Sequence, residues 1–212
     1  MLRLHRAVGP LATNVHVLAD DRSREAIAID TAIPSLEWIA AELAERDWTL
    51  RLIVSTHGHW DHIGDNARLA ARTGAKIAVH PLDAARLADP HPLWAPFDIP
   101  PSVAAVDLAE GGVIAFGAIR LRVLHTPGHT EGSVCLEAAD EGLVFSGDTL
   151  FAGSFGRVDL PGGDAAAMVE SLARLRAFAD DVGVLPGHGP TTTIGRERPW
   201  LDWIAREHRL PS

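Results

Sequence analysis

Four side chains that can bind metal stand within six consecutive positions of this 212-residue chain. Residues 55–64 read Ser-Thr-His-Gly-His-Trp-Asp-His-Ile-Gly, which includes His57, His59, Asp61 and His62. In an extended segment His57 and His59 point the same way, so that one ion can take both imidazoles. Asp61 and His62 lie further along and can turn toward a second ion. A solvated polar turn gives no reason for two histidines at i and i+2 followed by Asp-His, and we therefore predict metal binding.

Three other short segments share one design, an apolar run that stops at a possible ligand beside glycine. They are residues 124–133, 144–149 and 184–190, with candidate ligands His129, Asp148 and His188. Glycine suits such places because backbone and side chain must approach a small ion closely. Taken alone, each of these histidines is more typical of a turn or a cap, and Asp148 of an Asx turn. Together with residues 57–62, however, each of these three residues adds a donor that a metal site needs.

The complete set offers five imidazoles and two carboxylates: His57, His59, Asp61, His62, His129, Asp148 and His188. Nitrogen and oxygen donors suit zinc, manganese or iron, and give no reason to expect copper(I) or an iron–sulfur cluster. Seven donors are too many for one tetrahedral zinc with an open position, but they fit two ions that share a carboxylate. We predict two divalent ions, zinc before iron or manganese, with Asp148 as the shared ligand. Asp61 and Asp148 are the predicted catalytic carboxylates.

The elements that must position these side chains are short strands and helices along the whole chain. Apolar runs predict strands at 2–8, 14–19, 26–30, 50–54, 76–80, 103–108, 113–116, 119–124, 133–138, 143–146 and 182–185. Helical spacing predicts helices at 36–44, 67–72, 83–89, 164–178 and 199–207. This alternation favours the α/β class, an αβ/βα sandwich of two mixed sheets flanked by helices, with residues 1–212 as one domain. Asp30, at the end of one strand, either orients a ligand imidazole or caps its own turn.

Composition and charge are those of an ordinary globular protein and exclude several classes. Hydrophobic residues make up 47% of the chain and charged residues 22%. The formal net charge of -9, with no run of basic residues, argues against a nucleic-acid partner. No segment reaches 18 apolar residues, so we predict no membrane span, and the N-terminus has no signal-peptide pattern. The single Cys135 allows no intrachain disulfide and is predicted to be a small core residue, so we expect a cytoplasmic protein.

At this point the motifs resemble a known family. The segment His57-Gly-His-Trp-Asp-His62 is similar to the H-x-H-x-D-H signature of the metallo-β-lactamase superfamily, and the later candidate ligands fall where its later motifs fall. The resemblance runs from Val15 to about Ile194. Within the superfamily, residues 126–133, 145–151 and 185–190 look like the glyoxalase II (hydroxyacylglutathione hydrolase) branch, and residues 156–163 like its short, single-domain bacterial relatives.

The resemblance implies a division of the donors and a reaction. One ion would take His57, His59 and His129, the other Asp61, His62 and His188, with Asp148 bridging. The implied reaction is hydrolysis of an S-lactoylglutathione-like thioester, in which a hydroxide between the ions attacks the carbonyl and an ion stabilises the oxyanion. A thiolate leaving group, whose pKa is about 8.5, needs little protonation, so a separate general acid is not required.

The chain also departs from the glyoxalase II pattern. Full-length members carry a C-terminal helical domain that helps to bind glutathione, whereas about two dozen residues follow His188 here. They also have a basic residue and then an aromatic one that touch the tripeptide. Arg157 keeps the basic position and is the predicted substrate contact, but Asp159 stands where the aromatic would be. Arg157 therefore either binds substrate or pairs with Asp159.

Other functions remain open beside the thioester hydrolase. Persulfide dioxygenases look similar but bind a single iron, for which His57, His129 and Asp148 would serve here. A hydrolase of another ester or lactone and a non-enzymatic, metal-stabilised binding protein are the further alternatives. The complete seven-donor set favours the hydrolase, with a small-molecule thioester as its partner and a monomer or small homo-oligomer as its state.

Four residues have two interpretations each. Trp94 and Phe97 would line the substrate mouth or a subunit interface, and Arg196 and Arg198 would replace basic contacts or form a solvated face.

Overall fold

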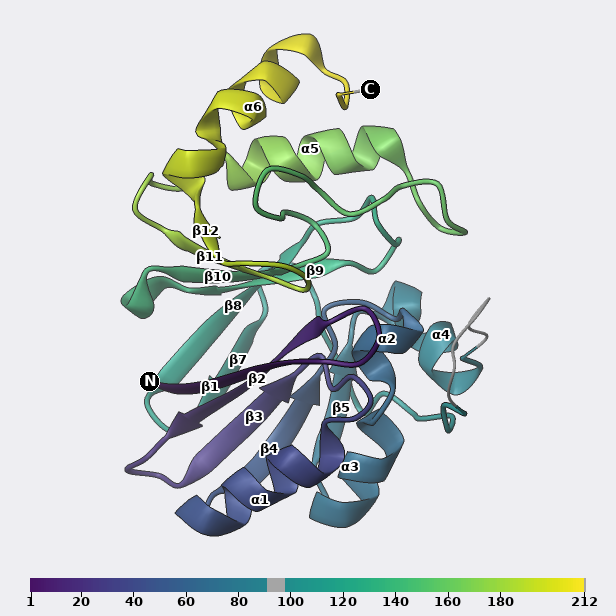
Figure 1. Ribbon diagram of the computed structural model, residues 1–212, viewed down its shortest axis with the longest axis vertical. Helices are drawn as coiled ribbons and strands as arrows, with labels where there is room; N and C mark the ends of the chain where they lie inside the picture. Colours follow the sequence, from purple (N-terminus) through teal and green to yellow (C-terminus); the bar gives the residue numbers. More distant parts are fainter. Residues whose placement is uncertain (91–97, 212) are drawn as a thin grey trace.

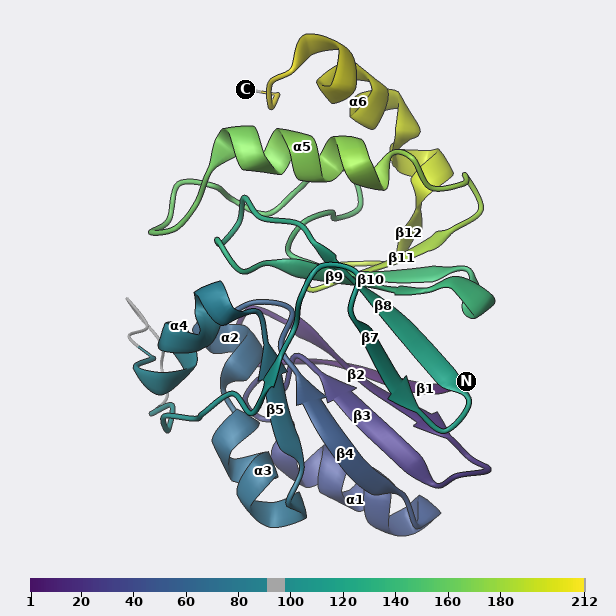
Figure 2. The same ribbon diagram turned by 180° about the vertical axis from the view of Figure 1, so that it is seen from behind.

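The fold consists of two six-stranded sheets, each covered on its outer side by helices (Figure 1). This computed structural model describes residues 1–90 and 98–211. The α1 and α3 helices cover one sheet and α5 and α6 cover the other, an arrangement that is the same from behind (Figure 2). The predicted αβ/βα sandwich of two mixed sheets is thereby confirmed. That residues 1–212 form one domain stays a prediction.

The first sheet comes from the N-terminal half of the chain and has the order β1-β2-β3-β4-β5-β6. Its strands are β1 (Leu2–Val8), β2 (Thr13–Asp20), β3 (Glu25–Ile29), β4 (Thr49–Val54), β5 (Lys76–Val79) and β6 (Val106–Asp107). The β1, β2 and β3 strands pair antiparallel, and β3 to β6 pair parallel. Its helices are α1 (Leu36–Arg46), α2 (Trp60–Ile63), α3 (Asn66–Thr73) and α4 (Ala84–Ala88), the last after a 3-10 turn at Pro81–Asp83. The carboxyl ends of the parallel strands therefore share one edge.

The second sheet comes from the C-terminal half and has the order β12-β11-β10-β9-β8-β7. Its strands are β7 (Val113–Phe116), β8 (Ile119–His125), β9 (Val134–Ala138), β10 (Leu143–Gly147), β11 (Gly183–Pro186) and β12 (Thr192–Thr193). The β10 and β11 strands pair parallel, and the other neighbours in this order pair antiparallel. Its helices are α5 (Ala165–Leu175) and α6 (Ile194–Glu207), and a 3-10 turn covers Ala139–Glu141. Asp164 caps α5 by accepting the amides of Ala166 and Ala167.

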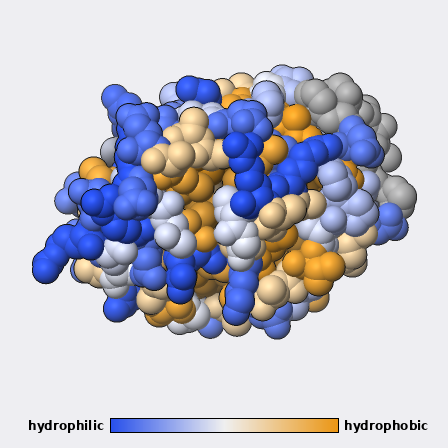
Figure 3. Space-filling model, turned by 90° about the horizontal axis from the view of Figure 1, so that it is seen from below, coloured by the Kyte–Doolittle hydropathy of each residue, from blue (hydrophilic) through white to orange (hydrophobic). Residues whose placement is uncertain are grey.

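Three layers of apolar side chains hold the sandwich together. One lies between the first sheet and its helices, with Ile39 and Leu69 fully buried. The middle layer joins the two sheets through side chains such as Phe145 and Leu121. The third packs α5 and α6 onto the second sheet, for example through Leu172. Seen from below, where α1 and α3 lie, hydrophilic side chains alternate with smaller hydrophobic areas (Figure 3).

Most predicted elements differ from the structure by up to three residues at an end, and two of the differences have a clear physical reason. The strand expected at 103–108 is only the two-residue β6, because Val103 is exposed and the ladder to β5 begins at Val106. The helix expected at 199–207 begins five residues earlier, at Ile194, and contains Pro199. Packing of its buried face outweighs the backbone hydrogen bond that Pro199 cannot make.

Two further predictions concern the surface. Trp94 and Phe97, expected at the substrate mouth or at a subunit interface, lie outside the described residues. Among the residues that are described, none of the helices combines the length and the apolar character that crossing a membrane would require.

Candidate metal centre

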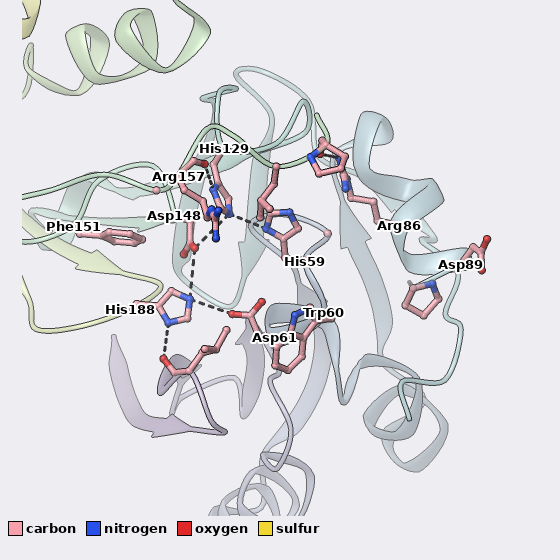
Figure 4. A pocket seen from close by; sticks show the side chains of 16 residues that line it. His59, Trp60, Asp61, Arg86, Asp89, His129, Asp148, Phe151, Arg157 and His188 are labelled. Carbon is pink, nitrogen blue, oxygen red and sulfur yellow. Dashed lines mark hydrogen bonds and ion pairs between the residues drawn. The ribbon is translucent and has the colours of Figure 1, made fainter. Parts of the chain in front are cut away.

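All seven candidate donors lie at one end of the sandwich, where strands of both sheets stop. The first sheet supplies the donors that follow β4, from His57 to His62, the last two of them on α2. The second sheet supplies His129 from the loop after β8, Asp148 directly after β10, and His188 after β11. The side chains of His59, Asp61, His129, Asp148 and His188 point toward one another (Figure 4). The sequence-predicted pattern of a strand followed by a donor is thus what brings them together.

The donors form two groups, as the resemblance implies. In the first group, His59 Nδ1 lies 3.1 Å from His57 Nε2 and 2.8 Å from His129 Nε2. The three ligand atoms all lie within 4.8 Å of one another, which is close enough to share one ion.

The second group is Asp61, His62 and His188, which satisfies the same distance limit. His188 Nε2 lies 3.2 Å from Asp61 Oδ2 and 3.2 Å from His62 Nε2. His62 Nε2 is 3.4 Å from the same Asp61 oxygen. Two imidazoles and a carboxylate therefore converge here, in place of the three imidazoles of the first group.

Asp148 lies between the two groups. Its Oδ1 is 3.4 Å from His62 Nε2, and its Oδ2 is 3.5 Å from both His129 Nε2 and His188 Nε2. Among the described residues, Oδ1 is buried and has no hydrogen-bond donor. A carboxylate that faces both groups and lacks a donor has the position that a shared metal ligand needs.

The hydrogen bonds behind the imidazoles decide which ring nitrogens carry lone pairs. His129 Nδ1 lies 2.7 Å from the carbonyl oxygen of Arg157, and His188 Nδ1 lies 2.9 Å from that of Leu11. A carbonyl only accepts, so each Nδ1 donates and each Nε2 keeps its lone pair for the site.

Asp30 and Thr56 lie against the outer nitrogens of two further rings, those of His57 and His62. Thr56 Oγ1 donates to Asp30 Oδ2 at 2.8 Å, so this hydroxyl oxygen can only accept from His57 Nδ1, at 3.2 Å. Asp30 Oδ2 also lies 3.0 Å from His62 Nδ1. Asp30 Oδ1 accepts the Thr56 amide at 2.7 Å. The orienting interpretation of Asp30 therefore holds, because this carboxylate binds the amide and hydroxyl of Thr56, next to His57, and faces His62. Among the described residues it accepts no hydrogen bond from its own turn.

The residues present therefore fit bound metal. The Nε2 lone pairs of His57 and His129 converge in one group, and those of His62 and His188 in the other, together with carboxylate oxygens. Facing lone pairs repel unless a cation or a proton stands between them. Imidazole and carboxylate donors with hydrogen-bonded outer sides are the usual environment of zinc or iron.

The pKa shifts of His57 and His59 are opposite to that of His62, which lies in the other group. Burial and the neighbouring imidazoles hold the pKa of His57 well below its usual range and lower that of His59 to about 3, so both are neutral. Burial also acts to lower the pKa of His62, but Asp148, Asp61 and Asp30 outweigh it and raise that pKa well above the usual range. Burial acts to raise the pKa of Asp61, yet His62 and His188 bring it below the usual range. A proton on His62 and a bound cation are thus alternative ways to compensate the same carboxylates.

Gly187 shows why glycine stands beside a candidate donor, as predicted from the sequence. A Cβ there would collide with Asp148 Oδ1 and lie 2.8 Å from His62 Cε1. The turn before His188 can therefore approach Asp148 and His62 this closely only without a side chain.

Comparison with known proteins gives the family. The profile described as "Metallo-beta-lactamase superfamily" matches residues 8–188. The chain belongs to this superfamily.

Three relatives place it within the superfamily. An Aquifex aeolicus protein described as uncharacterized is 40% identical, over 90% of this chain and 91% of its own. The "Hydroxyacylglutathione hydrolase GloC" of Haemophilus influenzae is 31% identical, over 87% of this chain and 89% of its own. The hydroxyacylglutathione hydrolase of Maricaulis maris is 34% identical over 85% of this chain, which spans 63% of that protein. The two relatives described as hydroxyacylglutathione hydrolases support the glyoxalase II-like branch.

Three solved structures share the fold closely. The BLEG-1 B3 metallo-β-lactamase has a TM-score of 0.85 and 30% identity, and covers 96% of this chain and 100% of its own. ETHE1 from Myxococcus xanthus has a TM-score of 0.83 and 28% identity, with coverages of 98% and 88%. TTHA1623, in a di-iron-bound form, has a TM-score of 0.81 and 36% identity, with coverages of 92% and 96%.

Sequence reasoning missed one residue that holds this superfamily site together. Asp83 is fully buried. Its Oδ2 accepts the Gly58 amide at 2.7 Å and the Thr130 hydroxyl at 2.7 Å, and its Oδ1 accepts the Gly132 amide at 3.0 Å. Gly58 lies between His57 and His59, and Thr130 follows His129, so one carboxylate ties both loops of the first donor group. The only signal in the sequence is an acid ahead of a helical stretch, which an ordinary helix start explains equally well.

A cavity of about 760 Å³ opens over both donor groups. Arg157, the predicted substrate contact, lines it, but its guanidinium pairs with Asp159. Arg196 and Arg198 do not line it. Arg198 instead binds Asp180 and the carbonyl oxygen of Phe178, which favours the structural interpretation of this residue.

Proposed function

We propose that this protein hydrolyses thioesters with two divalent ions held by the predicted seven donors. The observation that carries the proposal is the position of Asp148, which faces a complete three-donor group on either side. A mononuclear enzyme has no use for the second group. The names of the relatives from Haemophilus influenzae and Maricaulis maris support an acyl-thiol substrate.

The residues of the chain would position the reaction as follows. Two divalent ions at these donors would supply a hydroxide near neutral pH and a positive charge for the carbonyl oxygen. Asp148 faces both groups from the cavity wall, and Asp61 stays ionised beside His62 and His188. Water adds to the carbonyl carbon, the carbon–sulfur bond breaks, and a carboxylate and a thiolate are formed. The two protons of the water pass to solvent, which returns one of them to the thiolate. Because the thiol has a pKa of about 8.5, the sulfur leaves as thiolate without a protein acid.

The donor set narrows the identity of the metal only to zinc, iron or manganese. Zinc is our first choice, and the di-iron form of TTHA1623, at 36% identity, makes iron the second. A cytoplasmic location and a monomer or small homo-oligomer remain part of the proposal.

The test is hydrolysis of S-D-lactoylglutathione and of a neutral thioester, S-butanoyl-N-acetylcysteamine, followed by loss of thioester absorbance. Metal content is measured by mass spectrometry on the same protein. We expect saturable turnover of at least one substrate by protein that holds two ions per chain. In Asp148→Ala both metal and turnover should be lost, whereas Asp140→Asn, an exposed carboxylate in the 3-10 turn Ala139–Glu141, should keep both. A two-metal protein without turnover of either substrate refutes the proposal.

A persulfide dioxygenase is the second candidate, and the likeness to ETHE1 is the observation that favours it. A single iron would then use His57, His129 and Asp148. Iron at one ion per chain, with oxygen consumption on addition of a glutathione persulfide, would identify this case.

A further inference from the structure

The cavity over the metal centre has mainly apolar walls beyond the donors. Six apolar side chains contribute to them: Leu11, Trp60, Pro90, Phe151, Leu160 and Pro161. Leu11 and Phe151 stand beside the second donor group. The Leu11 carbonyl accepts from His188, and the Phe151 ring lies edge-on to the same imidazole, with centroids 6.0 Å apart. An apolar wall therefore begins directly beside His188, at the donor group where the thioester carbonyl would react.

The opposite wall, beside the first donor group, carries the two cations among the described lining residues. Arg157 Nε and Nη2 donate to the two oxygens of Asp159 at 2.7 and 2.8 Å, a bidentate pair. An exposed pair is easily broken. Even then, Asp159 stays next to any substrate group that binds Arg157. A substrate carboxylate would therefore meet no net positive charge at this pair.

The guanidinium of Arg86 is also bound by groups of the protein itself. Its Nη2 donates to the Pro161 carbonyl at 2.8 Å and lies 3.8 Å from a Glu131 oxygen. Its Nε lies 3.4 Å from the buried Asp83 carboxylate. This guanidinium braces the wall between α4 and the segment around Pro161, and its charge is compensated by two acids.

We infer that the cleft selects thioesters whose recognised part is neutral and apolar, in preference to the tripeptide glutathione with its two carboxylates. This inference rests on the proposed function, since it names the substrate class of the same site. Burial of alkyl groups against Leu11 and Phe151 is favourable. The carboxylates of glutathione would lose water without gaining an uncompensated cation.

The test uses S-alkyl thioethers, which cannot be hydrolysed, so binding is measured separately from the reaction. S-methyl and S-propyl derivatives of glutathione and of N-acetylcysteamine are titrated calorimetrically into the metal-loaded protein. We expect Kd to fall about 4-fold for each added methylene on either carrier. We also expect the neutral carrier to bind at least as tightly as glutathione. Binding by the glutathione derivatives that is about 10-fold tighter or more, or no gain with chain length, overturns the inference.

Two substitutions reverse the proposed selectivity. Asp159→Asn releases the Arg157 charge, and Leu11→Arg, at a side chain that is 39% exposed, adds a cation to the apolar wall. Both should tighten binding of the glutathione derivatives relative to the neutral ones, and Leu11→Arg should also abolish the gain with chain length. Asp140→Asn is the matched control and should change neither. If both substitutions leave the ratio of the two carriers unchanged, the walls do not select the carrier and the inference fails. Failure of all thioester hydrolysis in a protein that binds these ligands as expected would refute the proposed function alone.

Discussion

Asp83 should control the affinity of the first ion without touching it. In Asp83→Asn the amide can keep its oxygen toward Gly58 and Thr130, but it must then place its NH2 against the Gly132 amide. One hydrogen bond to a charged acceptor is lost and a buried N–H is left without a partner, a cost of about 2–4 kcal/mol in stability. Because the other contacts belong to the loops of His57, His59 and His129, part of this cost should appear as weaker metal binding.

The expected loss in affinity for the first ion is about 10- to 100-fold, as for other residues that orient metal ligands from behind. The assay is competition with a chromophoric chelator, which resolves the two binding steps. The second ion should keep its affinity, because Asp83 makes no contact with Asp61, His62 or His188 in the hydrogen bonds and ion pairs of the described residues.

Glu197→Gln is the matched control for this prediction. Glu197 is also buried and accepts three donors, the Gly153 amide, the Thr192 hydroxyl and the Trp200 indole. None of these three residues is a neighbour in sequence of a candidate ligand, so this variant should lose stability and keep both affinities. If Asp83→Asn loses stability as Glu197→Gln does while both ions bind as in the wild type, Asp83 is a structural residue only and our reasoning is wrong.

Three further predictions test other parts of the molecule. Asp30→Asn should lower the affinity for the second ion by about 10- to 100-fold, because it disturbs the contact to His62. A chelator competition that shows a loss of affinity only for the first ion would contradict this prediction. Removal of both metals should lower the melting temperature, because an ion at about 100 times its Kd adds about 2.7 kcal/mol to the free energy of unfolding. An unchanged melting curve after chelation would argue against a metal-filled native state. His16 is buried without a hydrogen-bond partner in the described part of the chain, and burial lowers its pKa from 6.5 to about 3. Protonation therefore favours the unfolded chain, and stability falls as pH drops from about 6.5 toward 3, by about 2 kcal/mol at pH 5. In urea titrations of metal-free protein, His16→Phe should lose about 2 kcal/mol less than the wild type between pH 7 and pH 5, whereas His208→Asn, at an exposed site, should behave as the wild type.

The sequence by itself determined the donors and the architecture. Each candidate ligand follows an apolar strand, and strand ends can be recognised from a few neighbouring residues, because the apolar period and the glycine after it are local signals. His57, His129, Asp148 and His188 therefore stand where their strands predict. The alternation of strands and helices gave the two-sheet sandwich for the same reason.

Only the tertiary structure decided which groups support these donors and how the elements end. Asp83 binds Thr130 and Gly132 across 47 and 49 positions of sequence, and no local pattern marks such a partner. Asp30 and Arg157 each had two interpretations in the sequence, and only the structure shows which side chains they contact, Thr56 and His62 for Asp30 and Asp159 for Arg157. The early start of α6 likewise follows from packing against the second sheet, which overrides the local effect of Pro199. Hydrogen bonds and burial between distant segments depend on the assembled fold, so a single sequence indicates the candidate ligands of this site but not the residues that hold them.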